Sequence, residues 1–217
     1  MKTLANRLLS APHALLISSL IMASLLLPVL VKAESTPVPK YKVEVIVFEH
    51  YALKGWTEER WPEEVELPST HKSTPLSSKG VSPLWMRSRT NQLNAVEQKM
   101  RNSYRVLFHQ TWSQNAYKSK KSPTVLIEND RKGGSTFLGT VRLYKTRFAH
   151  IEIDLELEKR IPTKVREAFA QNQQTPLAEL PSHWRFSLKE ARKIKPGELH
   201  YIDHPLFGVL IQVHKEK

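Results

Sequence analysis

Hydrophobic and polar residues alternate along several stretches of the chain, which is the pattern of β-strands with one buried face. The clearest stretch is Tyr41–Phe48, in which valines occupy every second position of its centre. Phe148–Glu158 alternates isoleucine or leucine with acidic residues, and its acidic face is expected to be a hydrated sheet face. Further strands are predicted at Tyr104–Trp112, Phe137–Tyr144, Trp184–Leu188 and Leu206–Val213.

A helical period is rarer than this alternation. Leu93, Val96 and Met100 form one apolar stripe within Thr90–Asn102, which predicts the principal helix of the chain. A short second helix is expected inside Arg160–Pro181, which otherwise looks like an insertion. Strands therefore dominate the expected structure.

Two long segments follow no period and are expected to be surface loops. Asn115–Gly134 is basic and rich in turn residues. Glu49–Arg89 contains three tryptophans, which we expect to pack against the core in preference to stacking on sugars. The order of elements predicts an α+β fold: a single domain, mainly antiparallel β-sheet, with one principal helix packed on a face and long surface loops.

The first 33 residues have the pattern of a signal peptide. Lys2 and Arg7 precede the apolar run Ala14–Val31, and small residues favour cleavage before Glu34. An uncleaved membrane anchor is the alternative, since the run is just long enough to span a bilayer. We expect a signal peptide at 1–33, a linker at 34–40, one domain at 41–217, and no stable membrane span after cleavage.

Charge narrows the class of partner. The formal net charge is +12, and removal of residues 1–33, with three cations and no acid, would leave +9. A surplus of this size favours nucleic acid, anionic lipid or an acidic cell-wall polymer, although a merely soluble basic domain would show it too. The absence of cysteine excludes disulfides, thiolate zinc sites and a cysteine nucleophile.

Four histidines, two of them in the closing segment, offer the most evident chemistry: His109, His150, His200 and His204. Together with an aspartate they could bind zinc, but no local metal signature is present, and buried histidines more often bond to backbone or carboxylate groups. No nucleophile elbow, phosphate loop or dinucleotide fingerprint occurs. We therefore predict no catalytic residue, no metal site and no cofactor.

The closing segment combines a polar half, Leu199–Pro205, with the apolar run Leu206–Val213. We expect Leu199–Gly208 to form a turn that lies against the strands of His109 and His150, as one polar patch at a sheet end. Gly208 predicts a bulge or the close approach of another backbone or a ligand. Asp203 and His204 are expected to brace the turn structurally. Ligand-binding roles are predicted for His109, Trp112, Arg147, His150, His200 and Tyr201.

Four separated segments resemble the CsiV family of periplasmic peptidoglycan-binding proteins. They are V-E-V-I-V-F-E-H at 43–50, Y-R-V-L-F-H-Q-T-W at 104–112, G-T-V-R-L-Y-K-T-R-F-A-H-I-E-I-D-L at 139–155 and G-E-L-H-Y-I-D-H-P-L-F-G-V-L at 197–210. A minor departure is Ala149, where the family often has leucine. The resemblance carries over no ligand residues.

The resemblance implies a non-catalytic periplasmic protein that binds peptidoglycan and promotes cell-wall synthesis. It also implies action with an outer-membrane lipoprotein that activates a bifunctional penicillin-binding protein, and no nucleic-acid partner. Two other classes stay open on the residues alone: a zinc-dependent cell-wall hydrolase using the histidines with Asp154 or Asp203, and an exported binder of nucleic acid or anionic lipid.

Overall fold

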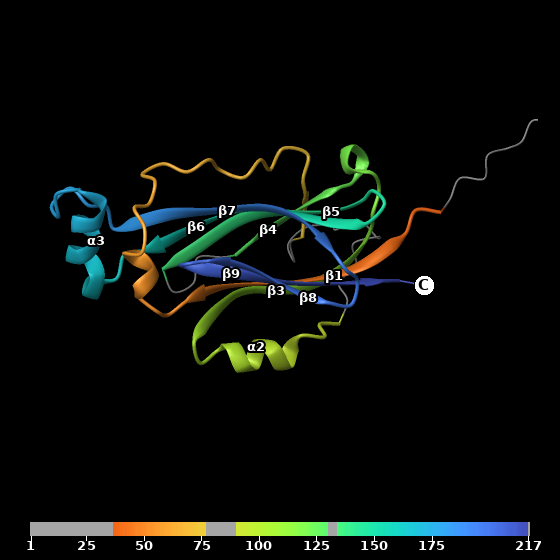
Figure 1. Cartoon of the computed structure of the whole chain (residues 1–217), viewed down its shortest axis with the longest axis horizontal. Coiled ribbons are helices and arrows are strands. Elements are labelled where there is room, and N and C mark those ends of the chain that lie inside the picture. Colours follow the sequence, from red (N-terminus) through yellow and green to blue (C-terminus); the bar gives the residue numbers. More distant parts are fainter. Residues whose placement is uncertain (1–36, 77–89, 130–133, 217) are drawn as a thin grey trace, which may run out of the picture. The chain divides into compact units, whose positions relative to one another are not determined.

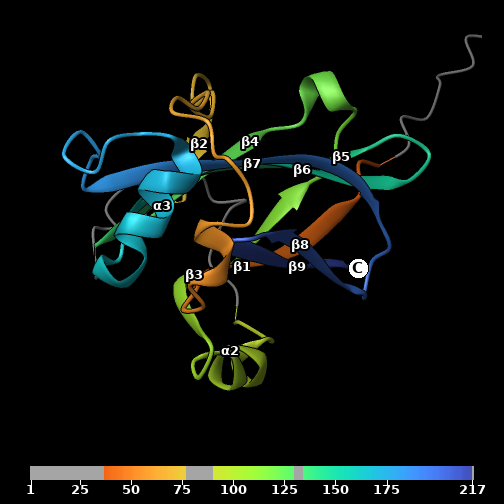
Figure 2. The ribbon, with the colours of Figure 1, turned by 60° about the vertical axis from the view of Figure 1, so that its left-hand side comes forward.

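Two β-sheets face each other and enclose one hydrophobic core (Figures 1 and 2). The computed structural model describes residues 37–76, 90–129 and 134–216. All of these residues except Pro37 belong to the compact unit Val38–Lys217. The expected signal peptide lies outside the described residues, as do residues 34–36 of the expected linker. Among the helices that are described, none is long and apolar enough to cross a membrane.

The four-stranded sheet, here called sheet A, has the order β3-β1-β9-β8 and is antiparallel. Its strands are β1 (Lys40–His50), β3 (Tyr104–Asn115), β8 (Leu199–His204) and β9 (Phe207–Lys215). The five-stranded sheet, sheet B, has the order β2-β4-β5-β6-β7 and is antiparallel except for the short β2–β4 pair. Its strands are β2 (Thr74–Pro75), β4 (Thr124–Glu128), β5 (Ser135–Lys145), β6 (Ala149–Arg160) and β7 (His183–Ile194).

The core forms because alternate residues of each strand point to the same side. Val43, Val45 and Val47 of β1 are fully buried, as are Ile151 and Ile153 of β6, and all belong to one cluster shared by the two sheets. The α+β prediction and its antiparallel sheet are confirmed, and 49% of the described residues lie in strands. The division of the strands into two facing sheets was not anticipated.

Most expected strands are present, with two main differences besides the two-residue strand β2, which lies within the expected loop Glu49–Arg89. The polar half of the closing segment is strand β8, which forms a hairpin with β9 through the two-residue connection Pro205–Leu206, so the expectation of a turn there is wrong. Its burial alternates, but the inward positions include His200 and His204, whose polarity hid the pattern. The second difference is β4, which lies within the segment expected to be a loop.

The helix expected within Thr90–Asn102 is α2 (Asn94–Met100), and it packs on the outer face of sheet A (Figure 1). Leu93, just before the helix, is buried together with Ile46 and Phe48 of β1, while Val96 and Met100 pack at the margin. The apolar stripe read from the sequence is therefore confirmed as the packing face. No residue within α2 itself is buried. The helix therefore contacts the sheet only through the partly buried Val96 and Met100 and through Leu93, which precedes it.

The second helix, α3 (Arg166–Gln173), follows the short 3-10 helix η4 (Thr163–Val165) at one end of the sheets. Phe169 of α3 lies edge-on to Trp56 and Trp184, with ring centroids 5.2 Å apart in both pairs. Trp56 closes the 3-10 helix η1 (Lys54–Trp56) and is fully buried. Trp61 is 8% exposed, so the packing role is confirmed for both tryptophans, while Trp85 lies outside the described residues.

Candidate functional site

The outer face of sheet B is a ladder of cross-strand rows. The acidic residues of β6 face basic partners on the neighbouring strands: Glu152 meets Arg142 of β5 at 2.5 Å, and Asp154 meets Lys189 of β7 at 3.4 Å. Glu158 pairs in the same way with Arg185 at 3.1 Å. The acidic face is thus neutralised by cations that the sequence pattern did not pair with it. Its carboxylates are half-buried and Glu156 is buried, so the expectation of a hydrated face is wrong.

Near the β5–β6 turn, aromatic and basic side chains replace the acid–base pairs of the ladder. In its last row Tyr144 and His150 stack at 5.1 Å with an interplanar angle of 7°, and Lys193 of β7 is the next cross-strand neighbour. Phe148, in the turn, is 45% exposed, and Arg147 and Lys193 lie over its ring at 5.4 and 3.9 Å from the centroid. No acidic side chain belongs to this row.

The turn is held in a defined conformation by hydrogen bonds. The Thr146 amide donates to the carbonyl of Phe148 at 3.0 Å, and Nδ1 of His150 donates to the same oxygen at 3.0 Å. That bond places the proton of a neutral His150 on Nδ1, so Nε2 is left as an acceptor. The stacked pair and the exposed phenyl ring therefore present fixed aromatic surfaces to solvent.

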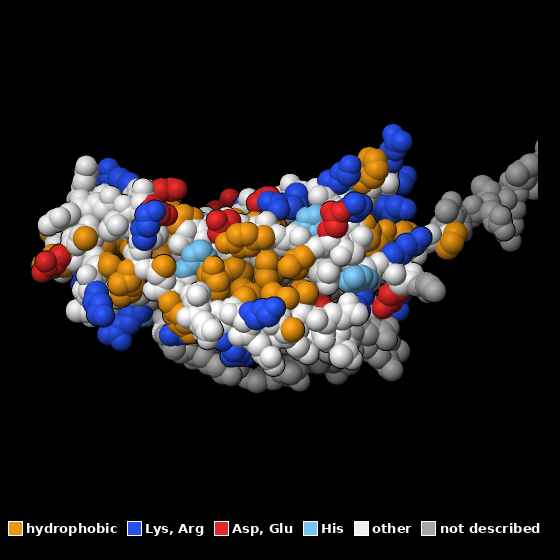
Figure 3. Space-filling view, turned by 60° about the horizontal axis from the view of Figure 1, so that its bottom comes forward, with side chains coloured by type: hydrophobic (Ala, Val, Ile, Leu, Met, Phe, Trp, Pro, Cys, Tyr) orange, Lys and Arg blue, Asp and Glu red, His pale blue; other side chains and the backbone are white. Residues whose placement is uncertain are grey.

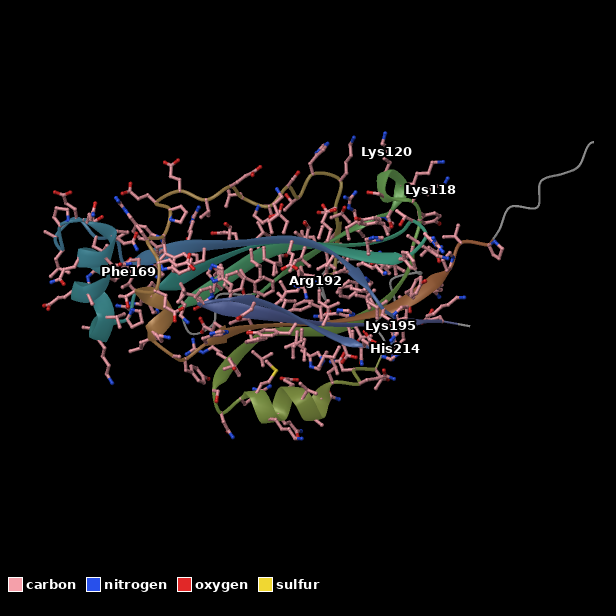
Figure 4. The ribbon with its side chains drawn as sticks, viewed as in Figure 1. Lys118, Lys120, Phe169, Arg192, Lys195 and His214 are labelled. Carbon is pink, nitrogen blue, oxygen red and sulfur yellow. The ribbon has the colours of Figure 1, made fainter. Side chains whose placement is uncertain are left out.

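Further cations come from the 3-10 helix η3 (Ser119–Lys121). Arg142 joins this segment to the ladder by donating to the carbonyl of Ser119 at 3.1 Å, and Tyr117 accepts from the amide of Lys145 at 2.8 Å through its carbonyl. Figure 4 shows Lys118 and Lys120 projecting at the same end of the strands. We call the hairpin surface the set Tyr144, Lys145, Arg147, Phe148, His150, Lys193, Lys118 and Lys120.

The hairpin surface suits an anionic ligand with flat parts. Within the part of the chain that the structure describes, none of its five cations is ion-paired with a carboxylate. Lysine and arginine bind carboxylates through charge-assisted hydrogen bonds, while exposed aromatic rings stack on flat faces such as those of sugars. A pocket of about 770 Å³ elsewhere in the molecule is a poorer candidate for an anion, because Glu63, Glu64 and Glu179 line it.

Arg147 and His150 were predicted as ligand residues and lie on the hairpin surface, so both stay candidates. The remaining predicted residues lie elsewhere. His109 is on the outer face of sheet A, beneath α2, with 5% of its side chain exposed. Its Nε2 is 2.8 Å from Glu44 and its Nδ1 is 2.7 Å from Glu97, so the imidazole bridges β1 and the helix.

This bridge fastens the helix to the sheet. Glu44 is fully buried, and its carboxylate also accepts from the amides of Gln92 and Leu93 at 2.8 Å, just before α2 begins. Hydrogen bonds from His109 and Arg101 lower the pKa of Glu97, although burial opposes them. Both nitrogens of His109 are engaged by carboxylates, which leaves neither free for a metal ion or ligand.

The expectation of one patch joining His109, His150 and His200 is wrong. His150 faces outward on sheet B, His109 faces outward on sheet A, and His200 shares the inward side of β8 with Ile202. The physical reason is the parity of the strands: neighbouring positions point to opposite faces, so strand ends that lie close do not bring all their side chains together.

His200 and Trp112 differ in exposure. His200 lies near the β7–β8 turn, where its Nε2 accepts from the amide of Lys195 at 3.4 Å. Trp112 is fully buried between the sheets, and its indole donates to Gln114 at 2.7 Å. In this conformation Trp112 offers no surface to a ligand.

Tyr201 lies on the outer face of sheet A and is 44% exposed. Its ring stacks on Phe48 at 6.1 Å, and its hydroxyl donates to Asp203, which together with burial raises the pKa of the tyrosine. Figure 3, viewed from the side that carries α2, shows hydrophobic side chains gathered at the centre of this face. Gly208 lies under both rings, because a Cβ there would be 2.7 Å from Phe48 and 2.9 Å from Tyr201. The groups closest to Gly208 are therefore aromatic side chains, where a bulge or the approach of another backbone or a ligand was expected.

His204 has the surroundings expected of a brace. It is 9% exposed, its ring packs on Phe207 and Trp61 at 4.6 and 5.0 Å, and its Nδ1 accepts from the amide of Leu206 at 3.1 Å. Burial lowers its pKa to about 4, in keeping with an unprotonated Nδ1. Asp203 is exposed and bonds to Tyr201 instead of capping the connection, so its part in a brace stays a prediction.

A charged cluster at the other end of the strands was missed. Glu49 is 2% exposed and accepts from Arg105, Lys159 and Ser135 at 2.9, 3.1 and 2.7 Å. Burial lowers the pKa of Lys159, and the Glu49 carboxylate opposes that shift. The signal was available, since extending the alternation of β1 past Val47 and of β6 past Leu157 places Glu49 and Lys159 on the inward face.

Metal chemistry has no candidate centre in the described ranges. Residues 37–76, 90–129 and 134–216 contain no group of three or more His, Cys, Asp and Glu side chains that could hold a metal ion.

The fold and the site together define an α+β protein of two mainly antiparallel sheets, with an exposed basic and aromatic surface suited to an anionic polymer. A family model described as "Peptidoglycan-binding protein, CsiV" matches residues 15–216. The chain belongs to this family, as the four strand segments indicated. The ligand in the family description, peptidoglycan, is a polymer of the kind that the basic hairpin surface suits. Membership of the family also indicates a location in the cell envelope. A search of curated proteins returned no match.

Proposed function

We propose that this protein is a non-catalytic peptidoglycan-binding protein of the periplasm, and that the hairpin surface holds the polymer. The observation that carries the proposal is the exposed Phe148 ring between Arg147 and Lys193, among cations with no carboxylate partner in the described residues. The ligand of the family supplies both parts that this surface suits. The peptide stems of peptidoglycan carry free carboxylates, and its glycan strands offer flat sugar faces.

Binding of this kind needs no bond to be broken. The cations neutralise carboxylates, the aromatic rings cover apolar sugar faces, and the defined turn limits the conformational freedom lost on binding. The alternative of a zinc-dependent hydrolase gains no support from a particular group of residues, since the predicted histidines are dispersed over different faces.

The test is co-sedimentation of the purified protein with isolated sacculi. We expect the protein to pellet with sacculi, and the double variant Arg147→Gln, Lys193→Gln to bind about tenfold more weakly, because each cation contributes on the order of 0.5–1 kcal/mol. A matched control is Lys99→Gln, Lys164→Gln, which removes two exposed charges away from the hairpin surface.

Two outcomes would contradict the proposal. If the unaltered protein stays in the supernatant at low salt, peptidoglycan is not its ligand. If both double variants lose the same affinity, net charge alone drives binding and the hairpin surface is not the site. Release of soluble fragments from the sacculi would show catalysis and overturn the non-catalytic part.

The same proposal includes promotion of cell-wall synthesis together with an outer-membrane lipoprotein that activates a bifunctional penicillin-binding protein. Its support is the resemblance of the four strand segments to the family. The measurement is glycan polymerisation by the purified synthase and lipoprotein, with and without this protein. We expect faster synthesis when all three are present, and an unchanged rate would end this part of the proposal.

A further inference from the structure

A small polar pocket lies at the end of the strands opposite the hairpin surface. Its volume is about 220 Å³, and we call it the end pocket. Its polar lining comes from the ends of β1, β3, β5 and β6, and includes Glu49, Arg105, Ser135, Lys159 and Arg160. Residues far apart in the sequence therefore converge on one opening at the margin of the core.

Burial of charge at this position is costly unless the charges are paired. Lys159 is 9% exposed, and its ammonium contacts the Glu49 carboxylate at 3.1 Å and the carbonyl of His50 at 2.8 Å. A buried ion pair generally contributes little stability compared with apolar side chains of similar volume. Core stability alone is thus a weak explanation for charged residues at inward positions that would suit leucine or valine.

Positive charge exceeds negative charge among the described lining residues. Three cations, Arg105, Lys159 and Arg160, face one carboxylate, Glu49. Arg160 is exposed, and its guanidinium has no hydrogen-bond or ion-pair partner within the residues that the structure describes. The ammonium of Lys159 has three N–H groups and two acceptors. Donors therefore remain for an incoming anion.

The pocket favours a monoanion next to a small apolar group. Glu49 would repel a second negative charge on the ligand, which disfavours phosphate relative to carboxylate. Leu53 and Pro162 supply apolar wall beside the charged residues, and Tyr51 adds a ring that is 48% exposed. A volume below that of sites for drug-sized ligands limits the occupant to one or two small residues.

We infer that the end pocket binds the C-terminal carboxylate of a short peptide that ends in a small aliphatic residue. Arg160 and Lys159 receive the carboxylate, Arg105 adds positive charge, and the apolar wall receives the terminal side chain. The identification of this peptide with a peptidoglycan stem rests on the proposed function, whereas the pocket chemistry does not. The protein would then contact the polymer at the hairpin surface and read a stem terminus separately.

The probe is N-acetyl-D-alanyl-D-alanine, titrated against the full-length protein by NMR, with its C-terminal amide and inorganic phosphate as comparisons. We expect the acid to bind at least about tenfold more tightly than either, as charge-assisted bonds require. Arg160→Gln should weaken acid binding by at least about fivefold without loss of fold, since the side chain is exposed. Lys215→Gln removes an exposed charge that belongs neither to the hairpin surface nor to the end pocket, and it should leave this titration unchanged.

Equal binding of acid and amide, tighter binding of phosphate, absence of acid binding, or an Arg160→Gln variant that binds normally would each overturn the inference. Sacculus binding separates it from the proposed function. If wild-type protein pellets with sacculi but ignores the acid, the end pocket inference fails alone. If the acid binds while sacculi do not, the pocket stands and the proposed function fails.

Discussion

The two ends of β6 carry positive charge in opposite settings. Next to its first residues, Arg147 of the preceding turn and Lys193 of β7 lie over the exposed ring of Phe148. Neither cation has a carboxylate partner among the described residues. At its last residues, Lys159 is buried and bound to Glu49. An exposed cation costs the fold little and stays open to salt and ligand, while a buried cation depends on its partner. Variants can test that difference from its largest consequence to its smallest.

The largest effect is expected from Glu49→Gln. This change leaves Lys159 buried without its counter-charge, and breaking a buried pair typically costs about 3–5 kcal/mol. The measurement is the free energy of unfolding in urea. The double variant Glu49→Gln, Lys159→Met should recover part of the loss, because the uncompensated charge is removed as well. Equal destabilisation of the single and double variants would show that the pair is not the cause.

A somewhat smaller effect should follow acidification, through His204. Its pKa is about 4 in the folded protein against an ordinary value of 6.5, so the unfolded chain binds a proton that the folded protein refuses between those values. The stability is complete above about pH 6.5 and falls as the pH is lowered towards 4, by up to about 3 kcal/mol. Urea unfolding across this range measures it.

The matched variants are His204→Phe and His71→Gln. Phenylalanine fits the aromatic surroundings and cannot titrate, so the fall between pH 6.5 and 4 should become shallower. His71 is exposed, and its replacement should leave the profile as it was. A His204→Phe protein with the original slope would remove His204 as the source.

A third prediction contrasts the two ends by ionic strength. Raising the salt from about 50 to about 500 mM should weaken sacculus binding several-fold, because exposed charges are screened. The stability lost in Glu49→Gln should change little over the same range, since buried pairs are screened less. Salt-independent co-sedimentation would show that the hairpin cations do not hold the polymer.

The smallest effect is expected on the exposed ladder of sheet B. Glu152→Gln removes one partner of Arg142, where both side chains are about one-third exposed, and it should cost less than about 1 kcal/mol. Thermal unfolding measures the change. A loss comparable with that of Glu49→Gln would erase the distinction between exposed and buried charge.

The long strands could be predicted from the sequence because one face of each is continuously apolar. In β1 and β6 the period of two persists along the strand, so the inward and outward positions were readable, although both strands end two residues later than predicted. Strand β8 was not predicted because two of its inward positions carry histidine. Strand β4 was not predicted because its five residues, within a basic segment, are too few to show a clear alternation. Partnership between strands is a long-range property that alternation does not encode.

The candidate site was predictable only where exposure follows from a turn. Arg147 lies between two well-marked strands, so its position at an exposed turn followed from the hairpin. His109 was misplaced because its contacts with Glu44 of β1, 65 residues away in sequence, and with Glu97 of α2 could not be read from a local pattern. Glu49 and Lys159 were missed for a different reason: charged residues ended the apparent strands, although the alternation continued through them.

The length of β6 has a consequence for how the polymer could be held. The strand has 12 residues, and at about 3.3 Å per residue its two ends are roughly 35 Å apart. The length of a hydrogen-bonded strand is fixed, so the distance between the hairpin surface and the end pocket is fixed as well. Simultaneous contacts at both would fall on different repeating units of the polymer. The protein would then bind the polymer at two sites a fixed distance apart, and its avidity would depend on how well the spacing of stems in the wall matches that distance.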